Sequence, residues 1–483
     1  MNNIFNKYLR YWQTLSGWKL IGFYFLHYTL LFFILQKNIF SDFAESNKSF
    51  IWAADGLGQY IPRYIYISEM FKECLYSFFS GNGLQIPIYN FFSWAAETDL
   101  QVEPFQWFAA VWPGDKIDIL YDILVIVRYY FIGFSFSILG LYFKQKPIAI
   151  LIGSVSYMFC GFSLYAGVIH PHFATPMILL PLLVVGAEEI LKNHKSILFA
   201  IIVFISLIDS LYWSCMLAIL IFIYILVRFL CVYKYTETSK FVSVICRFII
   251  WGCIGIALSG VVLVPTVFQI LGNGRIGRDA GNLVHYSSNV YEKFISNYIV
   301  IPDSAAFWNI LGFSVLAIPA IILLFTGKNI GKDRKSLRYL FLVLTIMYCS
   351  PFVAYVMSGF NEVMARWSFA YALCVAVIIM FELPRIQTES KNIIAAMTGC
   401  SFVYIIVCYF VIDRTNYHED SLALLVVSVL LLICCYVAGK QGKQIILPVC
   451  LFLTCVSVCY TATLMYESTK KDLLSEFVNK GEA

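Results

Sequence analysis

The chain has 483 residues, a formal net charge of +5, 60% hydrophobic side chains and 13% charged ones. A water-soluble domain carries roughly 25% charged residues, so this composition excludes a soluble enzyme and predicts a polytopic membrane protein. The basic residues are scattered singly between apolar runs and do not form a polybasic strip, so binding to nucleic acid is not indicated.

Apolar runs of about 17 to 25 residues, long enough to cross a hydrocarbon core of ~30 Å, recur along the whole chain. We predict an all-α, helical membrane protein in which residues 1–483 form a single transmembrane domain. About 13 spans are expected, within a range of about 11 to 14. They are placed near residues 18–39, 119–143, 147–169, 173–190, 197–211, 213–233, 248–271, 308–326, 339–358, 367–383, 393–412, 421–438 and 445–466.

The distribution of charge predicts how the spans are oriented. With the N-terminus inside, 20 of the 34 basic residues fall in cytoplasmic segments, as expected when Lys and Arg in short loops set the orientation. The two long connections, residues 41–118 and 272–307, are then external loops. The cytoplasmic stretches are too short for a nucleotide-binding domain and contain no Gly-rich phosphate loop. Any chemistry is therefore expected on the external face.

The first external loop carries a carboxylate, Asp55, beside Gly56 and shortly after the first span. A helix is predicted to start at Pro62, with apolar residues on one side and polar ones on the other, which is typical of a helix lying in the membrane interface. Asp55 could act as a base, or it could be an N-cap or turn residue. Gln59 and Arg63 belong to the same polar insertion, and Gln59 could equally be a hydrogen-bonding loop residue.

A second acidic group in this loop, which includes Glu97 and Asp99, follows an aromatic run that contains Tyr89 and Trp94. Aromatic rings beside carboxylates suit the binding of a sugar. The same rings are expected as anchors at the membrane interface, so both interpretations stay open.

Two external turns contain further candidates. His170 and His172 flank a proline and could bind a lipid phosphate, could bind a divalent ion if carboxylates joined them, or could simply form a turn. Asp209, at another turn, is interpreted as an interfacial capping residue.

Arginines supply candidate phosphate ligands. Arg275 and Arg278 lie among glycines in the second external loop, where guanidinium groups could bind phosphate oxygens or pair with charges of the same loop. Arg366 immediately precedes Trp367 at the membrane edge and could extend harmlessly to water or face a polar cavity.

Three stretches together resemble the YfhO-like family of bacterial membrane proteins over most of the chain. They are Ala54 to Tyr64, Ser163 to Gly186 and Met357 to Phe369. The family is regarded as having a GT-C type glycosyltransferase architecture. The resemblance implies transfer of a sugar from a polyprenyl-phosphate carrier to a cell-envelope polymer or glycan, such as a teichoic acid, on the external face of the bacterial plasma membrane.

The resemblance also makes Asp55 the counterpart of the catalytic acid of such enzymes and favours a functional Arg366. We therefore expect Asp55 to be catalytic, and we expect the protein to contact membrane lipids as well as the lipid-linked sugar and its acceptor. No cofactor is predicted, and a divalent ion is left open. The candidates for the donor phosphate are Arg278, Arg366, His172 and Arg275, and those for substrate contacts are Gln59, Arg63, Glu97, Asp99, His170, Asn361 and Trp367.

The alternative class is a transporter or flippase of a lipid-linked envelope precursor, which would use Arg128 and other polar groups near the midplane. A non-catalytic scaffold is a third hypothesis. A cavity at the external edge of the membrane favours transfer, whereas a polar cavity at the bilayer centre favours transport.

Overall fold

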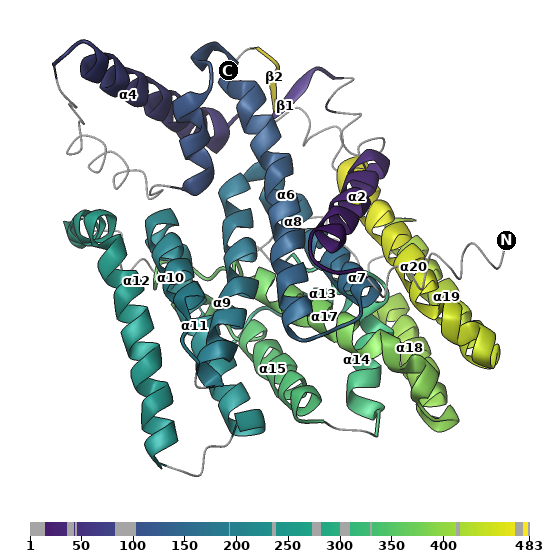
Figure 1. Cartoon of the computed structure of the whole chain (residues 1–483). Helices are drawn as coiled ribbons and strands as arrows, with labels where there is room; N and C mark the ends of the chain where they lie inside the picture. The colour runs from purple at the N-terminus through teal and green to yellow at the C-terminus, as the bar shows by residue number, and fades with distance from the viewer. Residues whose placement is uncertain are drawn as a thin grey trace.

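The computed structural model describes residues 15–35, 43, 46–82, 103–192, 194–233, 238–272, 282–299, 310–328, 331–411, 416–468 and 477–481. Most of these residues form helices packed side by side in one bundle (Figure 1). The longer helices are α2 (Trp18–Leu35), α4 (Ile61–Phe79), α6 (Ile117–Tyr142), α7 (Pro147–Met158), α8 (Gly161–Ile169), α9 (Thr175–Leu191), α10 (Ile197–Asp209), α11 (Leu211–Arg228), α12 (Thr238–Gly272), α13 (Ser288–Ser296), α14 (Ala317–Thr326), α15 (Lys332–Tyr348), α16 (Pro351–Met357), α17 (Ser368–Glu382), α18 (Lys391–Val411), α19 (Asn416–Val437) and α20 (Gly439–Ser468).

Every predicted span overlaps at least one of these helices, which confirms the all-α polytopic class. Within the described residues, eight helices are long and apolar enough to cross a membrane, and ten if each of two bent pairs is one span. Three shorter apolar helices, near the start of the chain, at α10 and at α14, account for the rest of the predicted set. The number thirteen itself stays a prediction.

In each of the two bent helix pairs, hydrogen bonds from outside the regular helix satisfy backbone groups at the bend. Between α7 and α8, which meet at 49°, the amide of Gly161 donates to the carbonyl of Leu311 at 2.9 Å. Between α15 and α16 the bend is 94°, and Ser350 caps the second helix by accepting from the amide of Val353. Pro351 lacks an N–H and fits the first turn of the new helix, so the break falls in front of it.

The centre of the bundle is tied together by polar contacts as well as apolar packing. The hydroxyl of Tyr28 on α2 donates to the carbonyl of Gly133 and lies 2.8 Å from Ser137 Oγ on α6 and 2.7 Å from Ser154 Oγ on α7. In an apolar interior such a bond has no competition from water. Gly153 allows α7 to approach α6, because a Cβ there would lie 2.8 Å from the ring of Phe136.

One end of the bundle carries a small sheet that sequence patterning did not predict. Strand β1 (Lys48–Trp52) pairs antiparallel with β2 (Phe477–Asn479), so the described end of the chain lies beside the start of the first long loop (Figure 1). Asp122 of α6 fixes β1, because its Oδ1 accepts from Ser49 Oγ and from the amide of Phe50, both at 2.7 Å. Twelve crossings separate these segments in the predicted topology, which agrees with their lying at the same end.

Helix α4 lies at this same end and is not among the helices that qualify as spans (Figure 1). Its buried side packs against the short helix η3 (Pro104–Val111). Ile65, Leu75 and Phe78 remain exposed. Exposed apolar side chains on a short amphipathic helix suit contact with lipid headgroups and upper acyl chains, as the predicted interfacial helix requires.

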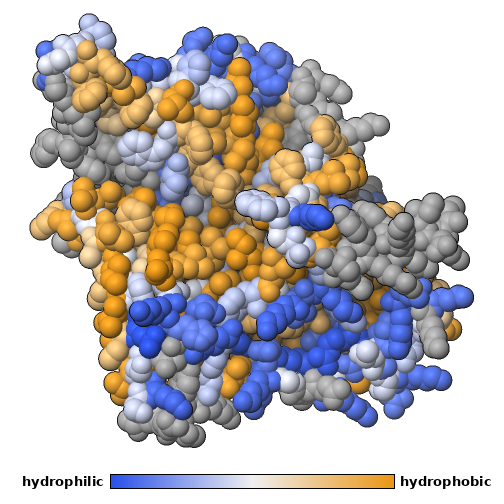
Figure 2. All heavy atoms as spheres, viewed as in Figure 1, coloured by the Kyte–Doolittle hydropathy of each residue, from blue (hydrophilic) through white to orange (hydrophobic). Residues whose placement is uncertain are grey.

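At the opposite end of the bundle lie basic residues, such as Arg228 and Arg334, that the charge distribution assigns to the cytoplasmic side. Figure 2 shows an apolar band between hydrophilic surfaces at the two ends of this face. Arg228 at the end of α11 pairs with Glu188 at 2.6 Å and with Asp333 at 2.7 Å, and Arg334 pairs with Glu382 at 2.9 Å. These pairs join α9, α11, α15 and α17 at one level of the bundle.

Candidate functional site

The turn that holds Asp55 is shaped by its neighbours. Asp55 precedes a five-residue π-helical turn, Gly56–Tyr60, which runs directly into α4. A Cβ on Gly56 would lie 3.1 Å from Ile51 Cγ2, so glycine lets this turn pack onto β1. The Asp55 side chain makes no capping bond to the backbone; its Oδ1 accepts from Gln59 Nε2 at 2.9 Å, and the side chain is 40% exposed. Asp55 thus holds the N-cap position of this turn without a side-chain capping bond, and the interpretation as a turn residue stays open.

His170 stands behind Asp55, with its Nδ1 3.9 Å from Asp55 Oδ2 and 2.5 Å from the hydroxyl of Tyr60. Burial, together with the nearby charge of Arg366, lowers the pKa of His170 to about 3, so the ring is neutral at physiological pH. Burial, together with the Asp55 carboxylate, raises the pKa of Tyr60. The hydroxyl of Tyr60 therefore keeps its proton and shares a hydrogen bond with Nδ1 of the neutral ring.

The neutral state of His170 predicts sensitivity to acid. Because the folded pKa lies below the ordinary value of 6.5, the unfolded state binds the proton first as the pH falls. Stability is then fully present above about pH 6.5 and falls by up to about 1.4 kcal/mol per pH unit between that value and the folded pKa. Thermal unfolding of the purified protein at pH 5 and 7 should show a smaller acid loss for His170→Gln than for the wild type. His194→Gln, at an exposed imidazole, is the matched control; an equal acid loss in all three proteins would contradict the assignment.

Behind the histidine lies a buried ion pair between α6 and the segment before η3. Arg128, 1% exposed, pairs with Glu103 at 2.5 Å, and Thr175 Oγ1 donates to the same carboxylate at 3.1 Å. The guanidinium also lies 4.6 Å from the centre of the Phe105 ring and 3.5 Å from the hydroxyl of Tyr64. Two buried charges are tolerated when each is paired and hydrogen-bonded, as they are here.

Arg366 reaches the same region from the loop before α17. Its guanidinium carbon lies 5.6 Å from the centre of the Phe173 ring, and Nη1 donates to the hydroxyl of Tyr212 at 3.5 Å. Phe173 stacks on His170 at 4.8 Å and contacts His172 edge to face. Arg366 therefore lies over the Phe173 ring and acts electrostatically on both histidines.

Arg63 completes the set from the first turn of α4, where its side chain is 1% exposed. Arg63 and Arg366 both act electrostatically on the hydroxyl of Tyr60, so they lie close to the turn of Asp55. Arg63, Arg128 and Arg366 all act electrostatically on His172, so the three guanidinium groups lie in one region, in which Glu103 pairs with Arg128. A low local dielectric strengthens their attraction for an incoming anion.

Asp209, at the end of α10, belongs to this region as well. It is 3% exposed, its Oδ1 has no hydrogen-bond partner, and its charge interacts with Glu103 and Arg128. Sequence patterning weighed this residue as an interfacial cap, which its burial contradicts. Tyr60 was not assigned to the site from sequence, and Glu103 was considered only as a member of the acidic group that contains Glu97 and Asp99. The sequence did contain one signal for this group: Arg128 lies inside an apolar span, where an arginine needs a buried partner.

The remaining predicted residues are placed differently. Asn361 is partly buried beside the same loop as Arg366, and its Oδ1 has no hydrogen-bond partner. Trp367 is fully buried, and its ring lies 5.7 Å from that of Tyr348. It therefore packs inside the bundle and is not exposed at the surface beside Arg366. The predicted residues that lie outside the described residues are Glu97, Asp99, Arg275 and Arg278.

His170 and His172 have ring centres 6.0 Å apart. In the part of the chain that the structure describes, His, Cys, Asp and Glu do not form any group of three or more that could hold a metal ion. The hydrogen bond from Tyr60 already uses one ring nitrogen of His170.

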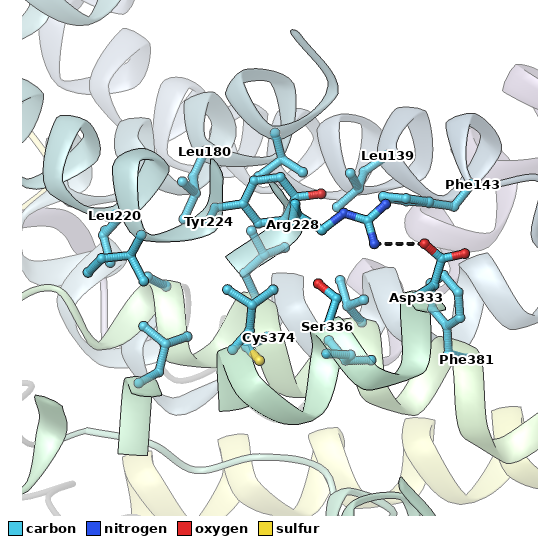
Figure 3. Close-up of a pocket in the computed structure, with 18 residues that line it drawn as sticks. Leu139, Phe143, Leu180, Leu220, Tyr224, Arg228, Asp333, Ser336, Cys374 and Phe381 are labelled. Carbon is cyan, nitrogen blue, oxygen red and sulfur yellow. Dashed lines mark hydrogen bonds and ion pairs between the residues drawn. The ribbon is translucent and has the colours of Figure 1, made fainter. Parts of the chain in front are cut away.

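Two pockets lie elsewhere in the described structure. The larger is formed by α6, α9, α11, α15 and α17 near Arg228 (Figure 3). The smaller is lined by residues that include Tyr286 and Phe294. Asp55 lines neither pocket. Its carboxylate is instead 40% exposed at the end of the bundle that carries α4.

Comparison with known proteins agrees with the fold. A family model described as "Bacterial membrane protein YfhO" matches residues 26–480. The chain belongs to this YfhO family. An "Uncharacterized protein YfhO" of Bacillus subtilis (strain 168) is 26% identical over 276 residues, which are 56% of this chain and 30% of that protein. The chain thus spans less than a third of the length of this YfhO relative, and it matches no solved structure.

Proposed function

We propose that this YfhO-family membrane protein is a glycosyltransferase that moves a sugar from a polyprenyl-phosphate carrier to a cell-envelope acceptor on the external face. The observation that carries the proposal is the position of Asp55. Its partly exposed carboxylate stands 3.9 Å from His170 and close to the buried Arg63 and the partly buried Arg366. A base and a set of cations at one place match a reaction that removes a proton and releases a phosphate.

In the proposed step, the acceptor hydroxyl oxygen attacks the anomeric carbon of the sugar while the bond from that carbon to the phosphate oxygen breaks. Asp55 takes the hydroxyl proton, and the electron pair of the broken bond leaves on the lipid phosphate. Arg366, with His172 beside it, stabilises the leaving phosphate. A single displacement of this kind inverts the anomeric carbon.

Gln59 and the Tyr60–His170 pair hold the base in place. Gln59 donates to one oxygen of Asp55, and the neutral imidazole lies near the other. Because His170 is neutral, it does not form an ion pair with the Asp55 carboxylate, which can then take the proton of the acceptor hydroxyl. Arg275 and Arg278 are proposed as further phosphate ligands from the second external loop.

The alternative of a transporter or flippase depended on polar groups at the middle of the bundle. Arg128, its main candidate, instead pairs with Glu103 and belongs to the group behind Asp55. The larger pocket is mainly apolar, and its charged residues lie at one end. These placements favour transfer at the end of the bundle that carries α4 over transport through its centre.

The test uses purified protein in lipid vesicles. The reaction contains polyprenyl phosphate that carries a radiolabelled sugar, together with an envelope-polymer acceptor. We expect label on the acceptor without any nucleotide sugar or ATP, and loss of the signal when the donor is replaced by the matching nucleotide sugar. Movement of intact labelled lipid between leaflets, with no label on the acceptor, would support a flippase and contradict the proposal.

A further inference from the structure

The larger pocket lies at the end of the bundle away from Asp55. Thr175 of α9 contacts the ion pair behind Asp55, whereas Glu188 of the same helix binds Arg228 at the pocket. Thirteen residues of helix separate them, about 20 Å along the axis. The pocket is therefore a separate site.

The walls of the pocket are mainly aliphatic and aromatic. Fourteen of its 18 lining residues have apolar side chains or are Cys374, and its empty space is about 770 Å³ with the open mouth included. The enclosed part of this space is about 100 Å³, which holds part of an acyl chain and not a whole lipid. Four of the five helices that form it qualify as spans, and the fifth, α15, belongs to a bent pair that does so. An apolar ligand at this depth comes from the membrane.

The four other lining residues are Tyr224, Arg228, Asp333 and Ser336. Figure 3 shows the ion pair between Arg228 of α11 and Asp333 of α15 reaching from one wall to the other. Ser336 is 1% exposed, lines the pocket, and its hydroxyl has no hydrogen-bond partner. A buried hydroxyl without a partner costs free energy, which an acceptor group on a ligand would recover.

Charge at the polar end favours a particular headgroup. Glu188 binds Arg228 through both of its oxygens, at 2.6 Å and 3.0 Å, and Asp333 binds the remaining guanidinium nitrogen. One cation thus faces two carboxylates, and the Asp333 side chain is 56% exposed. The exposed Asp333 carboxylate can attract an ammonium group, and the cations beside it in α15, such as Lys332, can attract the phosphate of the same headgroup.

We propose that the pocket binds a zwitterionic glycerophospholipid with an ethanolamine headgroup. Part of one acyl chain enters the apolar cavity between α11 and α15, and the rest of the lipid lies at its open mouth. The Ser336 hydroxyl donates to an ester carbonyl of the lipid, and Asp333 receives the ammonium group. Binding of this lipid is independent of the sugar-transfer reaction.

The test is lipid retention by the full-length protein. Wild type and variants are purified in detergent after exposure to mixed vesicles of phosphatidylethanolamine, phosphatidylglycerol and polyprenyl phosphate, and bound lipid is measured by mass spectrometry. We expect the wild type to retain phosphatidylethanolamine, and Leu220→Trp, which fills the pocket, to retain at least fivefold less. Leu226→Trp, at an exposed position on the same helix, is the matched control and should bind like the wild type.

Two milder variants keep the test decisive if Leu220→Trp fails to fold. Ser336→Ala should lower retention severalfold, and Asp333→Asn should lower the ratio of phosphatidylethanolamine to phosphatidylglycerol at least threefold. Selective retention of phosphatidylglycerol or polyprenyl phosphate by the wild type would overturn the proposed occupant. Retention that none of the three pocket variants changes would overturn the site.

Discussion

Asp55→Asn should reduce the rate of sugar transfer by a factor of about 10² to 10⁴, the usual contribution of a positioned general base. The amide preserves size and can still contact Gln59 and His170, but it cannot take the proton of the acceptor hydroxyl. Because the Asp55 side chain is partly exposed and does not cap the helix, the folded protein should be retained. The measurement is initial transfer rate per amount of folded protein, judged by size-exclusion chromatography.

Asp115→Asn is the matched control for this loss, because Asp115 is an exposed carboxylate between η3 and α6 at the same end of the bundle. Its transfer rate should equal that of the wild type. Equal rates for wild type and Asp55→Asn would remove Asp55 from the chemistry. A loss of rate accompanied by unfolding would mean that the carboxylate serves the turn.

Breaking the Arg128–Glu103 pair should have the largest effect on stability. Arg128→Met leaves the Glu103 carboxylate buried without its cation, and Glu103→Leu leaves the guanidinium in the same state. Each single change should lower the free energy of unfolding by about 3–5 kcal/mol. The double variant replaces both charges by apolar groups and should recover most of the loss.

The exposed pair of Lys192 and Glu189 provides the comparison, since its side chains are 40% and 33% exposed. Glu189→Gln should change the unfolding free energy by no more than about 1 kcal/mol. Denaturant unfolding of the wild type, the two single variants and the double variant forms a double-mutant cycle. Additive losses in the double variant would show that the two charges do not stabilise each other.

The helical class was predictable because long apolar runs are a local property of the chain. The same property misled at residues 308–326, where the helix begins only at Ala317. Before it, the amide of Gly312 bonds to the carbonyl of Asn297, and that of Phe313 to Tyr298. Apolar composition does not separate a buried irregular segment from a helix, because distant partners satisfy its backbone.

The candidate site was predictable in part. Asp55, Gln59, His170 and Arg366 stood out as polar groups at span ends, and the structure brings them together. The pairing of Arg128 with Glu103, the hydroxyl of Tyr60 on His170 and the burial of Asp209 depend on contacts between segments far apart in the sequence. The β1–β2 pairing has the same origin, since more than 400 residues separate the strands.

The most direct test is a density map of the protein with lipid-linked sugar bound. We predict that the phosphate lies within about 4 Å of the Arg366 guanidinium, a distance that allows an ion pair, and that the sugar lies beside Asp55. A donor bound instead in the middle of the bundle, with its sugar away from Asp55, would contradict the proposed transfer reaction.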